Sequence, residues 1–74
     1  MKFDGTKLTA RILAECGSMA AFAEKMGTDT RTAEKMAAMS VYWEVNDICR
    51  AVDVLHIEPA DISAYFFTPA RLLA

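Results

Sequence analysis

One stretch of the sequence, residues 18–39, constrains the fold more than any other because it is typical of two short helices joined by a tight turn. Ser18 is a favourable N-cap for the first helix. Gly27 stands where a helix end needs a residue that tolerates positive φ, and Thr28 and Asp29 can cap the second helix. A helix, a turn that contains glycine and a second helix together make the sequence outline of a helix-turn-helix.

Each helix of this unit has an apolar face and a polar face. The helices are expected at residues 18–26 and 29–38, and their inward residues are Phe22, Ala23, Met26, Ala33, Met36 and Ala37. The outward face of the second helix carries Thr30, Arg31 and Lys35. Arg31 and Lys35 lie about 40° apart on a wheel of about 100° per residue, nearly opposite the inward face. Two cations placed in this way have the geometry of a recognition helix.

Three further helices are predicted from apolar residues at helical spacing. One is expected at residues 6–16 and ends at Gly17, the next lies at residues 44–55, and the last begins at Pro59. Their inward faces are predicted to be Leu8, Ile12, Cys16, Val45, Ile48, Cys49, Val52, Leu55, Ile62, Tyr65 and Phe66. The predicted fold class is therefore all-α, a single domain of residues 1–74 with five short helices and the helix-turn-helix in the second and third.

The loop after the helix-turn-helix is unusually apolar, with Val41, Tyr42 and Trp43 close behind Met39. In one interpretation Val41 and Trp43 fold back as a lid over the core, and Trp43 packs against the next helix as a hydrophobic staple. In the other interpretation the loop is an exposed aromatic patch for a partner. We favour the lid.

The charge balance gives little support to nucleic-acid binding, which depends on neutralising phosphates. The chain has 8 basic and 10 acidic residues and a net charge of −2. Six basic and five acidic side chains give residues 1–35 a charge of +1, whereas two basic and five acidic ones give residues 36–74 a charge of −3. The half that contains the helix-turn-helix is therefore the less acidic half.

The titratable residues do not form a catalytic or metal-binding set. His56 is the single histidine and falls at the end of the fourth helix, where its ring can interact with the last carbonyls. Cys16 and Cys49 are expected to be reduced and buried. We therefore expect no enzymatic activity, no cofactor and no metal, and a cytoplasmic protein without a membrane span or a signal peptide.

Several short segments spread over the chain resemble one small family of Cro-like proteins from phages and prophages, within the Cro/CI-type (XRE-like) regulators. These segments are Lys2-Phe3-Asp4 with Lys7-Leu8, Ala21-Phe22-Ala23 with Gly27, Asp47-Ile48, and Tyr65-Phe66-Phe67-Thr68. The resemblance implies a lambda-repressor-like DNA-binding domain in the cytoplasm of a bacterial host. It also implies a sequence-specific repressor or switch protein that binds a paired operator in double-stranded DNA as a dimer.

Matching positions in the family assign DNA contacts to the helix-turn-helix. Bases in the major groove would be contacted by Thr30, Arg31 and Lys35, and phosphates by Ser18, Met19, Thr28 and Thr32. The chain departs from the family pattern at Ala37, Ala38 and Met39, where such regulators usually have Asn, Gly and Lys. The following loop to Trp43 contains no basic residue, so an expected phosphate contact is missing.

These departures support a second hypothesis, in which the same fold binds another protein such as a phage repressor. Asp29 and Glu34 put negative charge on or beside the helix that should enter the groove. Met39, Tyr42 and Trp43 lie near the same face, and methionine and aromatic residues are enriched at protein interfaces. DNA binding is the leading prediction, and the protein-binding module is the alternative.

The C-terminal end of the chain predicts self-association. Phe67, Leu72 and Leu73 have no obvious place inside a domain of this size, and leaving them in water forgoes about 1.5–3 kcal/mol each relative to full burial. The alternative is a monomer in which the C-terminal tail, residues 68–74, folds back over its own core. We predict a homodimer held by Phe66, Phe67, Leu72 and Leu73.

Overall fold

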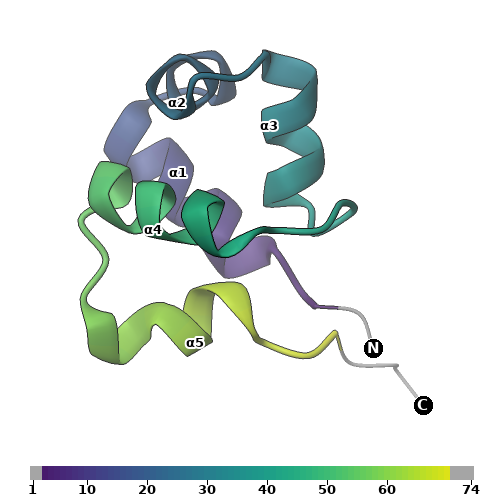
Figure 1. Cartoon of the computed structure of the whole chain (residues 1–74), viewed down its shortest axis with the longest axis vertical. Helices are drawn as coiled ribbons and strands as arrows, with labels where there is room; N and C mark the ends of the chain where they lie inside the picture. The colour runs from purple at the N-terminus through teal and green to yellow at the C-terminus, as the bar shows by residue number, and fades with distance from the viewer. Residues whose placement is uncertain (1–2, 71–74) are drawn as a thin grey trace.

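The computed structural model describes residues 3–70, which form five α-helices and one short 3-10 helix (Figure 1). In chain order they are α1 (Thr6–Cys16), α2 (Met19–Met26), α3 (Thr30–Ala37), α4 (Val45–Leu55), the 3-10 helix η1 (Pro59–Asp61) and α5 (Ile62–Phe66). The two ends of this part of the chain meet, because Phe3 and Pro69 form an isolated antiparallel bridge. Next to it, the Asp4 N–H donates to the Thr68 carbonyl at 2.7 Å.

The predicted all-α fold class is confirmed, and α1 has the predicted bounds. Gly17 and Gly27 end α1 and α2 in the left-handed conformation, at φ 85° and 76°. Ser18 and Asp29 cap α2 and α3 as predicted, each accepting a hydrogen bond from the N–H three residues further on, at 3.1 and 2.7 Å. Between residues 3 and 70, no helix is long and apolar enough to cross a membrane.

The last predicted helix is divided in two. Pro59 begins η1 rather than a continuous α-helix, and the Asp61 N–H donates to the Glu58 carbonyl at 2.8 Å, in the i→i+3 pattern of a 3-10 helix. α5 then continues to Phe66. The short η1 turn lets the chain reverse between α4 and α5.

The core lies where α1, α2, α3 and α4 meet. In Figure 1, α2 and α3 lie at one end of the molecule, α4 crosses the middle and α5 lies at the other end. The largest fully buried side chains are Leu8, Ile12, Phe22 and Leu55. Buried alanines lie among them and let the helices approach closely, because each adds only a methyl group; they are Ala23, Ala33, Ala37 and Ala51.

α4 contacts the core through part of its predicted face: Leu55 is fully buried as predicted, and Ile48 and Val52 pack against the core. Its buried residues are Ala51 and Leu55, and the two residues at the centre of the predicted face are half-buried. Val45 is 75% exposed and Cys49 is exposed, so the predicted burial of these two residues is wrong. The buried side of α4 is centred on Ala51 and Leu55, and on the helical wheel Val45 and Cys49 lie at the far edge of the apolar face from them. Cys16, the other free thiol, is half-buried.

Arg11 connects α1 to the C-terminal end of α4. Its Nε donates to the Leu55 carbonyl at 3.0 Å and its Nη2 to the His56 carbonyl at 2.8 Å, where the negative end of the helix dipole favours a cation. Its Nη1 donates to the Tyr65 hydroxyl at 3.4 Å. His56, predicted to interact with these carbonyls, instead ends α4 in the left-handed conformation at φ 54° and supplies one of the acceptors.

The observed face of α4 can be tested by truncating two of its residues. Leu55→Ala removes a fully buried side chain and should lower the free energy of unfolding by about 2–5 kcal/mol. Val45→Ala should change it by less than about 0.5 kcal/mol, because Val45 is 75% exposed. Urea unfolding followed by circular dichroism measures both values. Comparable losses in the two variants would contradict the orientation of α4.

The segment before α1 packs directly on the end of α3, at Gly5. This glycine is buried, and a Cβ atom placed on it would overlap the carbonyl oxygen of Ala37. Because the obstructing atom belongs to the backbone, a side chain fits only if α1 and α3 move apart. We expect Gly5→Ala to lower the free energy of unfolding by about 1–3 kcal/mol in the same urea experiment. Native stability in this variant would mean that the two segments lie further apart.

Candidate functional site

The loop between α3 and α4 is held in place by Trp43. Its indole N–H donates to the Met36 carbonyl at 2.8 Å, and its ring packs edge-on against Phe66 with the ring centroids 5.0 Å apart. At the start of the loop, the Ser40 N–H donates to the Lys35 carbonyl at 2.9 Å. The loop is therefore anchored on both α3 and α5.

Each interpretation of this loop applies to part of it. Trp43 is half-buried and forms the predicted lid. Val41, the second predicted lid residue, is 38% exposed. Tyr42 lies between them in sequence and is 88% exposed, as expected for a patch that meets a partner. The anchors on Trp43 thus fix a loop whose most prominent side chain points into solvent.

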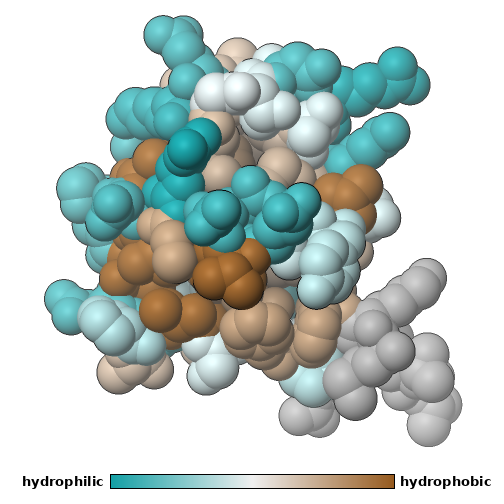
Figure 2. All heavy atoms as spheres, in the orientation of Figure 1, coloured by the Kyte–Doolittle hydropathy of each residue, from teal (hydrophilic) through white to brown (hydrophobic). Residues whose placement is uncertain are grey.

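An apolar groove of about 500 Å³ opens between this loop, the start of α4 and the end of α5. Its lining includes the half-buried Trp43 and the buried Phe66, and its most exposed apolar side chains are those of Tyr42, Val45 and Phe67. The other lining residues in the described part of the chain carry no charge; they are Phe3, Met39, Ser40, Val41 and Ile48. Figure 2 shows hydrophobic residues gathered between α4 and α5, below a row of hydrophilic residues over α4, and hydrophilic residues also cover much of the α2 and α3 end. We refer to this feature as the aromatic groove.

Val45 belongs to the aromatic groove although the sequence predicts it in the core. It is the first residue of α4 and follows the N-cap Glu44, whose N–H donates to the Asp47 carboxylate at 3.3 Å. A side chain in the first turn of a helix extends past the rest of the helix and is easily left uncovered. Its position directly after the cap is the one sequence signal for this exposure. In the sequence, Val45 has two carboxylates close by, that of Glu44 directly before it and that of Asp47 two residues after it.

A second hollow of about 440 Å³ shares Val41 and Tyr42 with the aromatic groove. Its lining is more polar and comes from the α2–α3 turn, α3 and α4: Met26, Gly27, Thr28, Thr32, Met36, Asp47 and Arg50. Nη1 of Arg50 donates to the Met26 carbonyl at 3.1 Å, which fixes the guanidinium at this hollow. Val41 and Tyr42 therefore form a ridge between an apolar groove and a polar hollow.

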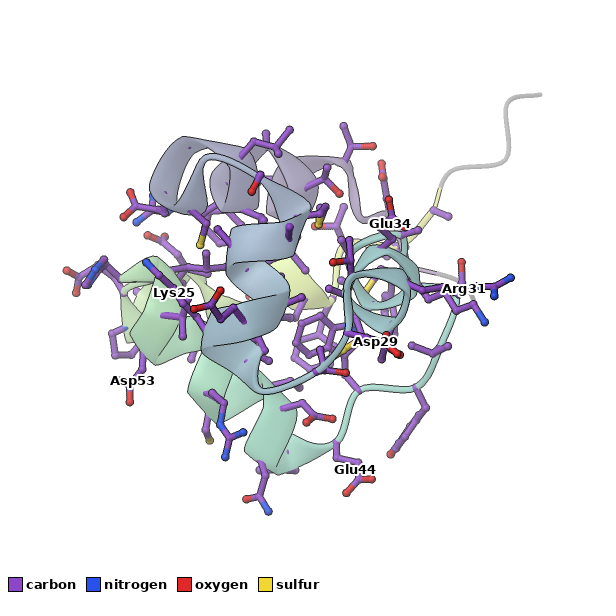
Figure 3. All side chains as sticks on the ribbon, turned by 90° about the horizontal axis from the view of Figure 1, so that it is seen from above. Lys25, Asp29, Arg31, Glu34, Glu44 and Asp53 are labelled. Carbon is purple, nitrogen blue, oxygen red and sulfur yellow. The ribbon has the colours of Figure 1, made fainter. Side chains whose placement is uncertain are left out.

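The seven residues predicted to contact DNA lie on α2, α3 and the turn between them. Ser18, Thr30, Arg31, Thr32 and Lys35 are exposed, whereas Met19 and Thr28 are half-buried. Figure 3 shows Arg31 projecting outward from α3. The Ser18 hydroxyl is occupied as the cap of α2.

Negative charge accompanies the exposed cations of α3. Hydrogen bonds from Thr32, first from its hydroxyl and then from its N–H, hold the pKa of Asp29 below its ordinary value. The Asp29 carboxylate therefore stays ionised at the start of α3, two residues before Arg31 in the sequence. Figure 3 shows Glu34 on the same helix, projecting in a different direction from Arg31. The outer surface of α3 thus carries mixed charge rather than a basic patch.

The predicted dimer residues differ in their exposure. Phe66 is buried in the core of its own chain, which removes it from the predicted interface. Phe67 is 46% exposed and packs edge-on against Phe3, with the ring centroids 5.6 Å apart. Leu72 and Leu73 lie outside the described residues. The homodimer itself stays a prediction.

Comparisons with known proteins give a family and a structural relative. The family described as "Protein of unknown function (DUF739)" matches residues 1–69. Among solved structures, the chain is similar to the modulator of repression (MOR) of the temperate bacteriophage TP901-1 from Lactococcus lactis. The two are 37% identical in sequence, the match covers 90% of each chain, and the TM-score is 0.75. No curated protein matches the chain.

This similarity overturns the leading prediction of function. The matched structure is that of a modulator of repression, and its 37% identity over 90% of both chains goes beyond a shared fold. The loop after α3 gives a physical reason, because it presents apolar side chains where a DNA-binding protein needs cations for phosphates. The prediction of a sequence-specific DNA-binding repressor is therefore wrong, and no DNA contact is proposed for α2 or α3.

The different roles of two neighbouring aromatic residues can be measured. Trp43→Phe keeps a ring against Phe66 but loses the hydrogen bond to the Met36 carbonyl, so we expect a loss of about 1 kcal/mol in unfolding free energy. Tyr42→Ala should change stability by less than about 0.5 kcal/mol, because Tyr42 is 88% exposed. Thermal and urea unfolding of both variants would test this. A strongly destabilised Tyr42→Ala protein would mean that the loop depends on Tyr42 as well.

Proposed function

The chain belongs to the DUF739 family, and we propose that it is a phage or prophage modulator of repression that acts by binding a repressor protein. The observation that carries this proposal is the 37% identity with the TP901-1 modulator of repression over 90% of each chain, at a TM-score of 0.75. Fold alone would say little about function, but here the sequence is shared along most of the chain as well. The proposed role is regulatory and non-enzymatic, in the cytoplasm of the bacterial host.

The surface around the aromatic groove supports a protein partner. Tyr42, Val45 and Phe67 expose 88%, 75% and 46% of their surface on one apolar feature. Contiguous exposed apolar surface on a small protein marks an interaction site, and tyrosine is among the residues that contribute most to binding energy at interfaces. The predicted partner residues Met39, Tyr42 and Trp43 all line the groove.

The resemblance to Cro/CI-type regulators fits this proposal at the level of architecture. α2 and α3 keep the two short helices and the tight turn of a helix-turn-helix. The surface of α3 mixes the cations Arg31 and Lys35 with the carboxylates of Asp29 and Glu34, which weakens attraction to phosphates. We infer that the chain keeps the helix-turn-helix arrangement as a scaffold for recognising a protein.

The proposal predicts direct binding to the repressor encoded by the same phage or prophage. Isothermal titration of the purified chain into that repressor should give a 1:1 or 2:1 complex with a dissociation constant of about 1 μM or tighter, that is, about −8 kcal/mol. In a gel shift with operator DNA, adding the chain should change the amount of repressor-bound DNA. The chain alone should leave the same DNA unshifted at about 0.15 M salt.

Two outcomes would contradict this function. One is a chain that shifts operator DNA by itself, with an affinity that falls steeply as salt is raised, because that is the behaviour of a DNA-binding protein. The other is a chain that neither binds the repressor nor alters its DNA binding. A repressor from an unrelated phage serves as the control for specific association.

A further inference from the structure

The apolar stripe of α4 is covered by this chain along one edge only. Ile48 and Val52, at the centre of the stripe, are half-buried. Val45 and Cys49, at the other edge, are exposed. The sequence therefore contains a wider apolar helix face than its own fold buries. Such a face is covered when a second apolar surface packs on it.

The aromatic groove continues this uncovered stripe toward α5. The exposed edge residue of α4, Val45, stands at one wall of the groove, and Phe67 follows α5 at another. Trp43 and Phe66 pack edge-on between them and close the interior. The result is an apolar depression between two helices, and grooves of this kind bind amphipathic helices through apolar residues at i, i+3, i+4 and i+7.

The segment that supplies every described lining residue of the groove except Phe3, residues 36–70, is acidic. Residues 36–70 contain five carboxylates and one guanidinium. That guanidinium, on Arg50, donates to the Met26 carbonyl at the second hollow rather than lining the groove. Glu44, at the start of α4, lies between the groove residues Trp43 and Val45 in sequence, whereas Asp47 lines the second hollow.

The two cations of α1, Lys7 and Arg11, lie over the Tyr65 ring. Nζ of Lys7 lies 4.7 Å from the centroid of the Tyr65 ring, and the Arg11 guanidinium lies 5.8 Å from the same centroid. Tyr65 does not line the groove. An occupant that approaches the groove therefore meets apolar side chains and no cation among the described lining residues, with the Glu44 carboxylate next to Trp43 and Val45 in the sequence.

We propose that the aromatic groove receives one amphipathic helix of the partner protein, with its apolar row on Tyr42, Val45 and Phe67 and with basic residues along its flank. This inference rests on the proposed function, since the partner is the repressor, and it adds the surface and the chemistry of the segment that is bound. A second copy of this chain fits less well. Two copies of this face would bring the carboxylates at the start of each α4 together, and like charges at an interface oppose association.

The test compares groove variants with a matched control in binding to the full repressor. Tyr42→Ala and Val45→Ser change exposed residues, so both proteins should keep the native helix content. Each should weaken binding about tenfold or more. Leu13→Ser is the control, because Leu13 is 48% exposed on α1 and does not line the groove, and it should change binding less than about twofold.

The basic flank of the bound helix is tested by removing a carboxylate and by varying salt, and occupancy of the groove is tested by fluorescence. Glu44→Gln should weaken binding about two- to fivefold, and raising salt from about 0.1 to 0.5 M should weaken the native complex and affect the variant less. Trp43 is the single tryptophan of the chain and lines the groove, so its fluorescence reports occupancy. Tryptophan-free synthetic peptides for each helix of the repressor should include one basic amphipathic helix that shifts this emission.

The possible results separate this inference from the proposed function. Equal binding of the repressor by the native chain, Tyr42→Ala and Val45→Ser would overturn the groove as the docking site while the proposed function stands. Absence of repressor binding by the native chain would overturn both. Light scattering that shows a native dimer and a monomeric Tyr42→Ala variant would assign the groove to a second copy. If a variant truncated after Ala70 bound the repressor much more tightly than the native chain, the groove would be assigned to the chain's own C-terminal segment.

Discussion

The hydrogen bond from the Trp43 indole to the Met36 carbonyl determines the shape of the face that we assign to a partner. Met36 belongs to the last turn of α3, and the Trp43 ring rests on Phe66 at the end of α5. One side chain therefore joins the helix-turn-helix to the C-terminal helix through a loop that has no regular structure. Because Trp43 is fixed in this way, Tyr42 is left outside and the space between α4 and α5 stays open as a groove.

The exposed apolar surface follows from the size of the chain. With 74 residues, of which 54% are hydrophobic, the chain has more apolar side chains than its small interior can cover. The centre of the molecule is filled by a few large residues and by alanines, among them Ala51, where α4 approaches closely. Val45 and Cys49, at the far edge of the α4 stripe, are left at the surface. This uncovered apolar surface is the one that we propose binds a partner.

The same two-helix arrangement serves different kinds of partner when the side chains around it change. DNA recognition requires cations on the outer face of the second helix and in the loop that follows it, because phosphates dominate the affinity. Here α3 combines Arg31 and Lys35 with two carboxylates, and its loop carries Val41, Tyr42 and Trp43. The fold constrains where a surface lies, and the residues on that surface decide what it binds.

Local sequence determined the helices and their ends, because caps and glycines act within a few residues. Ser18, Asp29, Gly17 and Gly27 mark helix boundaries that the structure reproduces. Periodicity also identified the residues of α1, α2 and α3 that face the core, and the departures in the loop after α3 supported a protein-binding alternative. The family resemblance led to the wrong prediction of DNA binding, because it rested on the shared helix-turn-helix pattern although the loop after α3 lacks the cations that contact phosphates.

Tertiary structure alone decided which side of α4 is buried, because the choice between the Ala51 side and the Val45 side depends on how closely the other helices approach. It also decided that Phe66 lies in the core while Phe67, the next residue, is exposed. The close packing of Gly5 against Ala37, the capping of α4 by Arg11 and the aromatic groove join segments that are far apart in sequence. No local pattern encodes such contacts, since they exist only after the helices have been placed against one another.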